Sequence, residues 1–283
     1  MVSRAILSQH GNLPSLKVEG TMKLWSGNGV GRLASISVGG ELHALLEYSI
    51  SLAWNFKQAK NVSRNTSTML KSLSNRGILA SEELPRYDSD DLVGLAGEVL
   101  LKAFSSFLGY EAIYTKWETN GTSKSKGIDL VARMHAGVTK VALFEAKHLH
   151  ESVKEHAPTE CYTPIRLKFR EGLAGFDLDD TRINLAAIIC KLDGNLELQR
   201  AVGGSDGKIE QIRNLLSNTL RNESYSLEVM ACIDGKYCDG GSLNTSLSGV
   251  VYPQNLGTRD AGLSILKCES LEEETKGICD KYA

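Results

Sequence analysis

Two short apolar segments joined by a turn constrain the fold of this chain more than any other part of its sequence. Residues 128–134 and 141–146 are long enough for one strand each, and residues 135–138 between them have the length and composition of a hairpin connection. A turn of this length sets the register of the pair and places Asp129 opposite Glu145. The sequence therefore predicts an antiparallel strand pair with a carboxylate on each strand.

The elements around this pair favour an architecture of both helices and strands. A helix is expected from residue 89 or 90 to about residue 108, where Gly109 ends it, and a strand follows at 111–116. Hydrophobic periodicity then predicts helices at 179–192 and 208–220 and a strand at 227–233. This order predicts an α/β or α+β core in which helices flank one sheet.

An acidic stretch that contains one proline, residues 81–90, marks the expected boundary between two regions. Before it, helices are expected at 41–60 and 69–79, so residues 1–88 are predicted to be a mainly helical N-terminal region. That region carries no visible chemistry and is large enough to dock a partner. Residues 89–283 are predicted to form the domain that carries the function.

Charge and hydropathy exclude several classes of protein. Lysine and arginine number 32 and aspartate and glutamate 34, so the formal net charge of −2 excludes contact with nucleic acid or an anionic membrane by bulk charge alone. The most apolar long stretch, residues 92–110, is interrupted by Glu98 and Lys102, and the N-terminus is too short in its apolar part for a signal peptide. The six cysteines form no CxxC pair. We therefore expect a cytoplasmic chain with no membrane contact, disulfide framework or zinc ribbon.

Asp129, Glu145 and Lys147 are charged residues that the expected register gathers at one end of the apolar strand pair. In the expected register Asp129 and Glu145 lie opposite each other, and two carboxylates so placed repel unless a cation compensates them. Their hard oxygen atoms, with no histidine or cysteine among them, suit Mg²⁺ or Mn²⁺ better than zinc. Lys147, two residues after Glu145 on the same strand face, would sit beside the cation and orient water or stabilise charge on a phosphate. This chemistry fits hydrolysis of a phosphodiester.

Each of these residues also has a purely structural interpretation. An E-x-K triplet is common and can be the charged rim of an edge strand, and Glu98 can pair with Lys102 on a solvated helix face. Taken alone, the triplet favours the simpler interpretation. With Asp129 in a compatible register and an acid-bearing helix upstream, the catalytic interpretation is favoured.

The order of these parts resembles the PD-(D/E)xK nucleases, the restriction-endonuclease-like superfamily. In that superfamily a helix carrying an acid precedes a sheet whose second and third strands supply an Asp and a Glu-x-Lys. The matching residues here are Glu98, Asp129, Glu145 and Lys147, and Ile128 stands in place of the proline of the nominal motif. The resemblance implies a restriction-endonuclease-like core, with a central mixed sheet flanked by helices, and a Mg²⁺- or Mn²⁺-dependent DNA endonuclease.

The resemblance also implies a role for each residue of the site. Asp129 and Glu145 would bind the metal, with the carbonyl oxygen of Ala146 as a third ligand. Lys147 would handle the water, and Glu98 would support the metal or the lysine.

A narrower resemblance rests on residues 94–98, 107–110, 127–129 and 144–148, which look like the nuclease subunit of Hachiman anti-phage defence systems. It implies an effector nuclease that acts on DNA beside a superfamily 2 helicase partner. Two alternatives stay open: a stand-alone restriction or repair nuclease, and a non-catalytic DNA-binding scaffold with a nuclease-like fold. The presence of all four motif residues counts against the scaffold.

Two basic segments are candidate DNA contacts. Residues 161–170 alternate cations with apolar residues, so a strand there would carry three cations on one face, along a phosphate backbone or in an ordinary half-buried strand. The second segment is the loop that leads into the first acid of the site, which lies near DNA or is simply solvated. The candidate residues are Lys124, Lys126, Arg166, Lys168 and Arg170. Because the glycine-rich residues 27–31 lack the lysine and Ser/Thr of a phosphate-binding loop, no ATP site is expected on this chain.

Overall fold

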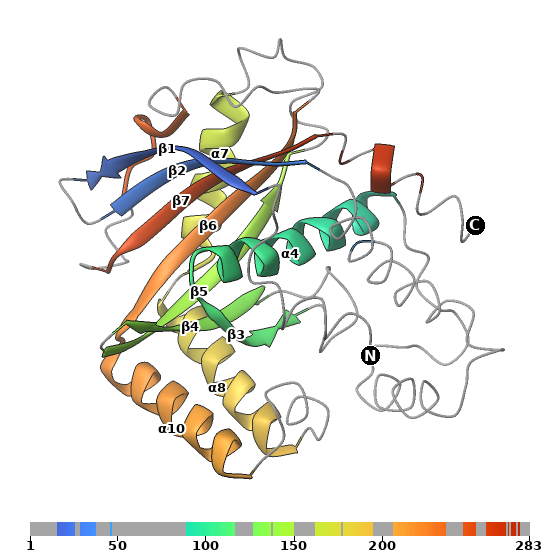
Figure 1. The fold of residues 1–283 in the computed structure, drawn as a ribbon. Coiled ribbons are helices and arrows are strands. Elements are labelled where there is room, and N and C mark those ends of the chain that lie inside the picture. Colours follow the sequence, from blue (N-terminus) through green and yellow to red (C-terminus); the bar gives the residue numbers. More distant parts are fainter. Residues whose placement is uncertain are drawn as a thin grey trace, which may run out of the picture.

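The strands form one seven-stranded sheet, in which neighbouring strands follow the order β1-β2-β7-β6-β5-β4-β3 (Figure 1). The computed structural model describes residues 16–25, 29–37, 46, 89–116, 127–136, 138–149, 162–176, 178–194, 206–235, 246–252, 259–269, 271, 273–275 and 277. The strands are β1 (Lys17–Leu24), β2 (Gly29–Ser37), β3 (Glu111–Thr115), β4 (Leu130–Ala136), β5 (Val138–His148), β6 (Tyr225–Asp234) and β7 (Ala261–Glu269). Pairing is parallel from β2 through β7 and β6 to β5, and antiparallel at both ends of the sheet. The predicted α/β class is confirmed, and the sheet is mixed.

The predicted hairpin forms in the predicted register. Leu130 pairs with Phe144 and Ala136 with Val138, which is the register expected from the turn. The elements differ from the prediction at their ends: β4 begins at Leu130 rather than at residue 128, and β5 continues to His148. Asp129 therefore lies immediately before β4, at the open end of the strand pair away from the turn, which we call the mouth of the pair.

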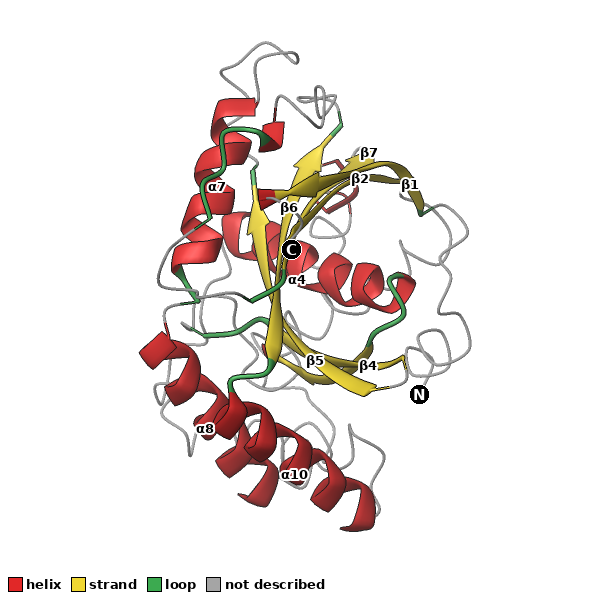
Figure 2. Cartoon of the chain, turned by 90° about the vertical axis from the view of Figure 1, so that its left-hand side faces the viewer, coloured by secondary structure: helices red, strands yellow, loops and turns green. Residues whose placement is uncertain are grey.

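Helices cover both faces of the sheet (Figures 1 and 2). Helix α4 (Ser89–Phe107) packs on one face, where Phe104 and Phe144 share a buried cluster. The opposite face is covered by α7 (Tyr162–Ala174), α8 (Leu178–Gly194) and α10 (Asp206–Asn222), with Leu143 of β5 in their cluster. Successive residues of β5 thus face opposite layers, as a strand requires. None of the described helices is long and apolar enough to cross a membrane.

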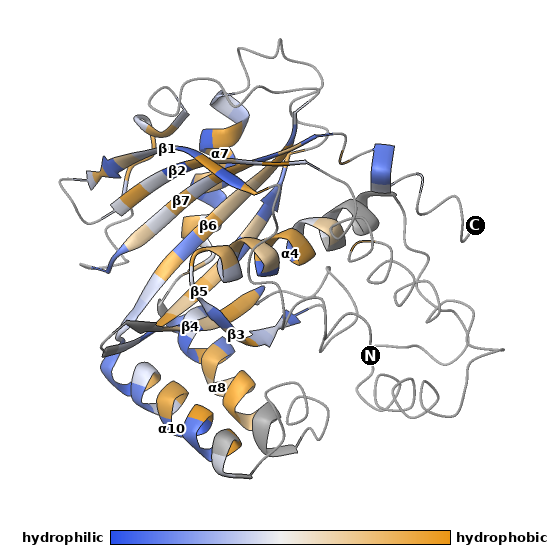
Figure 3. Cartoon of the chain, in the orientation of Figure 1, coloured by the Kyte–Doolittle hydropathy of each residue, from blue (hydrophilic) through white to orange (hydrophobic). Residues whose placement is uncertain are grey.

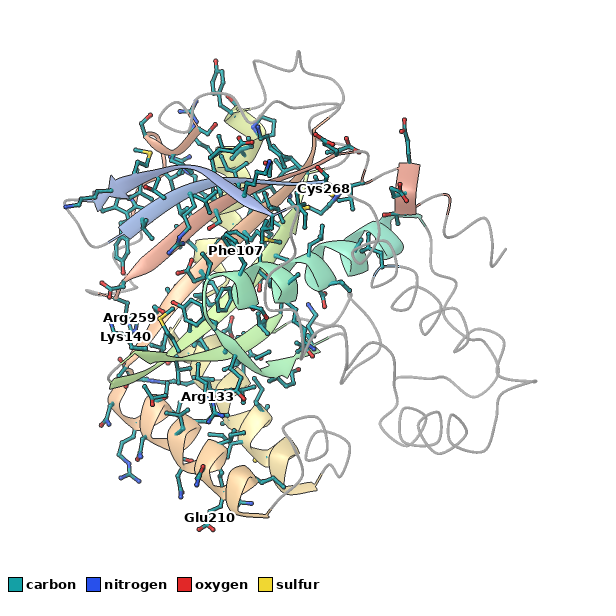
Figure 4. The ribbon with its side chains drawn as sticks, in the orientation of Figure 1. Phe107, Arg133, Lys140, Glu210, Arg259 and Cys268 are labelled. Carbon is teal, nitrogen blue, oxygen red and sulfur yellow. The ribbon has the colours of Figure 1, made fainter. Side chains whose placement is uncertain are left out.

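The helix ends and faces follow from the sequence. Helix α4 stops where Gly109 adopts a φ of 86°, a left-handed conformation that favours glycine, as predicted. On α10, Ile209, Ile212 and Leu216 are buried at helical spacing, and hydrophilic residues cover the remaining surface (Figure 3). Glu210 projects from the opposite side of α10, away from the sheet (Figure 4). The helices predicted at 179–192 and 208–220 are confirmed as α8 and α10.

The strand predicted at residues 161–170 is wrong, because this segment belongs to helix α7. Ile165, Phe169 and Leu173 are fully buried and lie four residues apart, which is the spacing of one helix face. Pro164 lies in the first turn, where a helix tolerates proline. The alternation of cations over five residues suggested a strand, but the longer apolar period determines the structure.

The sheet crosses the boundary expected at residue 88. Strand β2 pairs with β7 from Gly29 to Ser37, so β1 and β2, which precede the boundary, belong to the same sheet as the strands that follow it. The helices expected at 41–60 and 69–79 lie outside the described residues, except for Leu46, which is helical and buried.

A buried ion pair joins β2 to β6 across the strand that lies between them. The Arg32 Nη1 atom lies 2.9 Å from Glu228 Oε2, and the Glu228 side chain is 8% exposed. Gly262 of β7 is the register partner of Glu228, and a Cβ atom at this position would overlap the carboxylate. Burial raises the pKa of Glu228, and the Arg32 guanidinium opposes that rise. The absence of a side chain at Gly262 therefore makes room for the pair.

We expect Gly262→Ala to lower the free energy of unfolding by about 1–3 kcal/mol, because the methyl group has no space beside the buried carboxylate. Chemical denaturation followed by circular dichroism measures this change. Gly207→Ala in α10 is the matched control, because its Cβ would meet no atom within 4 Å. Equal stability of the two variants would contradict the close approach at residue 262.

Candidate active site

The mouth of the β4–β5 pair brings together three of the four predicted site residues, Asp129, Glu145 and Lys147. The Asp129 N–H donates to the carbonyl of Phe144 at 3.2 Å, and the Ala146 N–H donates to Asp129 Oδ2 at 2.8 Å. The backbone of β5 therefore fixes the Asp129 carboxylate beside Glu145. Lys147 Nζ lies 2.8 Å from Glu145 Oε1, so the E-x-K triplet forms its own ion pair at the same place.

A glycine turn leads the chain into Asp129. Gly127 has a φ of 136°, which side-chain-bearing residues rarely adopt. A Cβ atom there would also approach the Asn184 side chain of α8 to 3.3 Å. Position 127 thus favours glycine for its conformation, and a larger residue would also crowd Asn184.

Glu98 reaches the same cluster from helix α4. Its side chain is 6% exposed, and its Oε1 atom lies 3.3 Å from Lys116 Nζ. The alternative that placed Glu98 on a solvated helix face is therefore wrong. Its second oxygen, Oε2, is buried and has no hydrogen-bond partner among the described residues. A buried carboxylate oxygen in this state is a position that an absent cation or water would satisfy.

Lys116 was not predicted as part of the site, because it ends the strand expected at 111–116 and borders a loop that was expected to be solvated. It follows β3 directly, its side chain is 7% exposed, and its ammonium contacts both Asp129 Oδ1 and Glu98 Oε1. Its N–H also donates to the carbonyl of Asp129 at 2.8 Å. The available signal was a lysine that immediately follows an apolar strand, but nothing local in the sequence reveals its partners.

The cluster contains one more carboxylate than ammonium groups. Burial raises the pKa of Glu98 to about 8, with a further contribution from the Asp129 carboxylate and partial opposition from Lys116. Burial and Asp129 likewise raise the pKa of Glu145 to about 7, against the opposing charge of Lys147. Burial alone would lower the pKa of Lys116, but Asp129 and Glu98 outweigh it and raise that pKa. A proton or another cation therefore balances the extra negative charge.

The three basic residues of α7 that were predicted to contact DNA do not share one face. Arg166 lies with its guanidinium 4.9 Å from the Tyr162 ring centroid, and Lys168 pairs with Glu171 at 2.7 Å. On a helix Arg170 shares a side with Arg166, four residues earlier, while Lys168 lies on another side. The predicted single face of three cations is therefore wrong. Lys124 and Lys126 lie outside the described residues.

The donor atoms of the site agree in kind with Mg²⁺ or Mn²⁺. They are carboxylate oxygens together with the carbonyl of Ala146, and the unpartnered Oε2 of Glu98 adds a buried oxygen. In the described part of the chain, however, no three acidic, histidine or cysteine side chains are close enough to hold one ion. Lys116 occupies the space between Glu98 and Asp129 instead.

A comparison with protein-family models and with curated proteins found no match to this chain.

In EDTA, we expect the free energy of unfolding to fall as pH rises from about 5 to 8. Glu98 and Glu145 retain protons in the folded state over this interval, whereas an unfolded glutamate, with a pKa of about 4.3, does not. Denaturant titrations at a series of pH values measure the slope, which Glu98→Gln should reduce.

Glu19→Gln is the control for this slope. The Lys267 side chain holds the pKa of Glu19 below its usual value, so its titration lies below the tested interval. A free energy of unfolding that stays constant between pH 5 and 8 would show that the acids of the site are already ionised and would contradict their raised pKa values.

Proposed function

We propose that this chain is a metal-dependent DNA endonuclease built on a restriction-endonuclease-like core. The observation that carries the proposal is the position of Asp129, whose carboxylate accepts the N–H of Ala146 and thereby lies beside Glu145 and Lys147. Acids from adjacent strands with a lysine at their side suit hydrolysis of a phosphodiester.

The arrangement of elements supports the same proposal. Helix α4 carries Glu98 and precedes β3, β4 and β5. Counted from α4, Asp129 directly precedes the second strand, β4, and Glu145 lies on the third, β5. This is the order in which the PD-(D/E)xK nucleases present their acids. Helices cover both faces of the mixed sheet, as the resemblance implies (Figure 2).

In the proposed reaction each residue has a distinct task. Asp129, Glu145 and the carbonyl of Ala146 would hold the metal, which when bound supplies a Lewis acid for the scissile phosphate. Lys147 is 25% exposed and pairs with Glu145, so its ammonium can orient water or stabilise negative charge on the phosphate. In the metal-free site Glu98 holds Lys116 against Asp129 and so positions that carboxylate before the metal binds.

The partner of this nuclease is proposed to be a superfamily 2 helicase, within an anti-phage defence complex in the cytoplasm. The net charge of −2 supports a subunit whose DNA is delivered by another chain. ATP use would belong to that partner. Co-purification of a helicase with the tagged chain from its host tests this part, and recovery of the chain alone would favour a stand-alone nuclease.

Cleavage of plasmid and linear DNA in Mg²⁺, Mn²⁺ or EDTA tests the activity itself. We expect cutting with either metal and none in EDTA. The double variant Glu145→Ala/Lys147→Ala should lose at least about 100-fold in rate, because it removes one proposed metal ligand and the lysine that handles water. The assay is run with and without a helicase partner.

Glu19→Gln/Lys267→Met is the matched control, because it removes an ion pair between β1 and β7 of the same 2.8 Å length. Its cleavage rate should equal that of the wild type. Metal-independent cutting would contradict the proposal, and DNA binding without cutting under any condition would favour the scaffold.

A further inference from the structure

Lys116 is a buried cation placed between two acids of the proposed active site. Its side chain is 7% exposed, and its ammonium contacts Asp129 Oδ1 and lies 3.3 Å from Glu98 Oε1. An ammonium group loses its hydration when buried, so it is stable there only because carboxylates replace the water. Lys116 thus fills the role of a counter-ion within the cluster.

Both oxygens of Asp129 are engaged in this arrangement. Oδ2 accepts the N–H of Ala146 at 2.8 Å, and Oδ1 accepts the ammonium of Lys116. The Ala146 N–H belongs to the backbone of β5, which pairs on both sides along the sheet, so this donor is fixed. The lysine ammonium sits on a flexible four-carbon stem and can move. Of the two donors, Lys116 is the one that a metal ion can displace.

We propose that Lys116 is the resident cation of the metal-free site and that it competes with a divalent metal for the Asp129 carboxylate. This inference rests on the proposed function and deepens it. A divalent ion at Asp129 and a lysine ammonium on the same carboxylate repel each other, so one excludes the other. Lys116 thereby weakens binding of the free metal and sets the concentration at which the site loads.

Binding of Mn²⁺ alone tests this competition. Isothermal titration calorimetry, with electron paramagnetic resonance of the unbound ion, gives the dissociation constant for the wild type and for Lys116→Met. Methionine keeps most of the apolar stem and removes the charge. We expect Lys116→Met to bind Mn²⁺ at least about tenfold more tightly than the wild type.

Lys267→Met is the matched control, because Lys267, like Lys116, forms an ion pair with a glutamate, but on β7 against Glu19 at 2.8 Å. Its affinity for Mn²⁺ should equal that of the wild type. Equal affinity of Lys116→Met and the wild type would overturn the competition and leave the proposed nuclease intact. Failure of both proteins to bind Mn²⁺ would refute the metal dependence, and the competition with it.

A second measurement keeps the proposal testable if Lys116→Met does not fold. If Lys116→Met is unfolded in EDTA, circular dichroism should show that Mn²⁺ restores its structure, which a merely structural lysine would not allow. If it stays unfolded, a crystal structure of the wild-type protein with Mn²⁺ decides. An anomalous peak at Asp129 with the Lys116 ammonium displaced supports the proposal, and a peak with the ammonium still on Asp129 overturns it.

Discussion

The hydrogen bonds that join Asp129 to β5 determine how Asp129, Glu145 and Lys147 lie relative to one another. The Asp129 N–H bonds to the carbonyl of Phe144, and the Ala146 N–H bonds back to the Asp129 carboxylate. Because strand side chains alternate between faces, a slip of one residue would move Glu145 and Lys147 to the α4 layer. The apolar residues of β5 oppose such a slip, since Phe144 packs under α4 and Leu143 under the opposite layer.

The rest of the sheet holds this hairpin through contacts between distant parts of the chain. The pair Arg32–Glu228 joins residues 196 positions apart and passes over Gly262. It ties the N-terminal strands to β6, and β6 in turn pairs with β5 along the site. A buried ion pair of this kind specifies one arrangement of strands, because a carboxylate left without its guanidinium would be costly in the core.

The parts of the site that were predictable are those made by neighbours in the sequence. The hairpin connection is short, so the register that places Asp129 beside Glu145 follows from counting residues. Lys116 reaches Asp129 through the pairing of β3 with β4, which spans a long connection and contains a register shift. Local composition predicts neither the pairing of β3 with β4 nor its register shift, so the contact between Lys116 and Asp129 could not be predicted.

The elements of the fold that were predictable are likewise those with a clear local signal in the sequence. Helices α4, α8 and α10 show a clear helical period and a glycine or polar end, so they were predicted. Strand β7 is a short apolar run buried in the sheet, and such a run does not separate strand from helix by periodicity. In α7 a brief alternation of charge obscured the spacing of Ile165, Phe169 and Leu173.

The ammonium of Lys116 has a consequence for the order of events during biosynthesis. Three carboxylates gathered at one end of a sheet would repel as the chain closes, and many metal sites therefore form only when the ion arrives. Here the chain brings two positive charges of its own, Lys116 and Lys147, to the same place. Under the proposed function, the newly made protein can therefore reach its final structure before a metal is supplied, and assembly of the fold is separate from loading of the site.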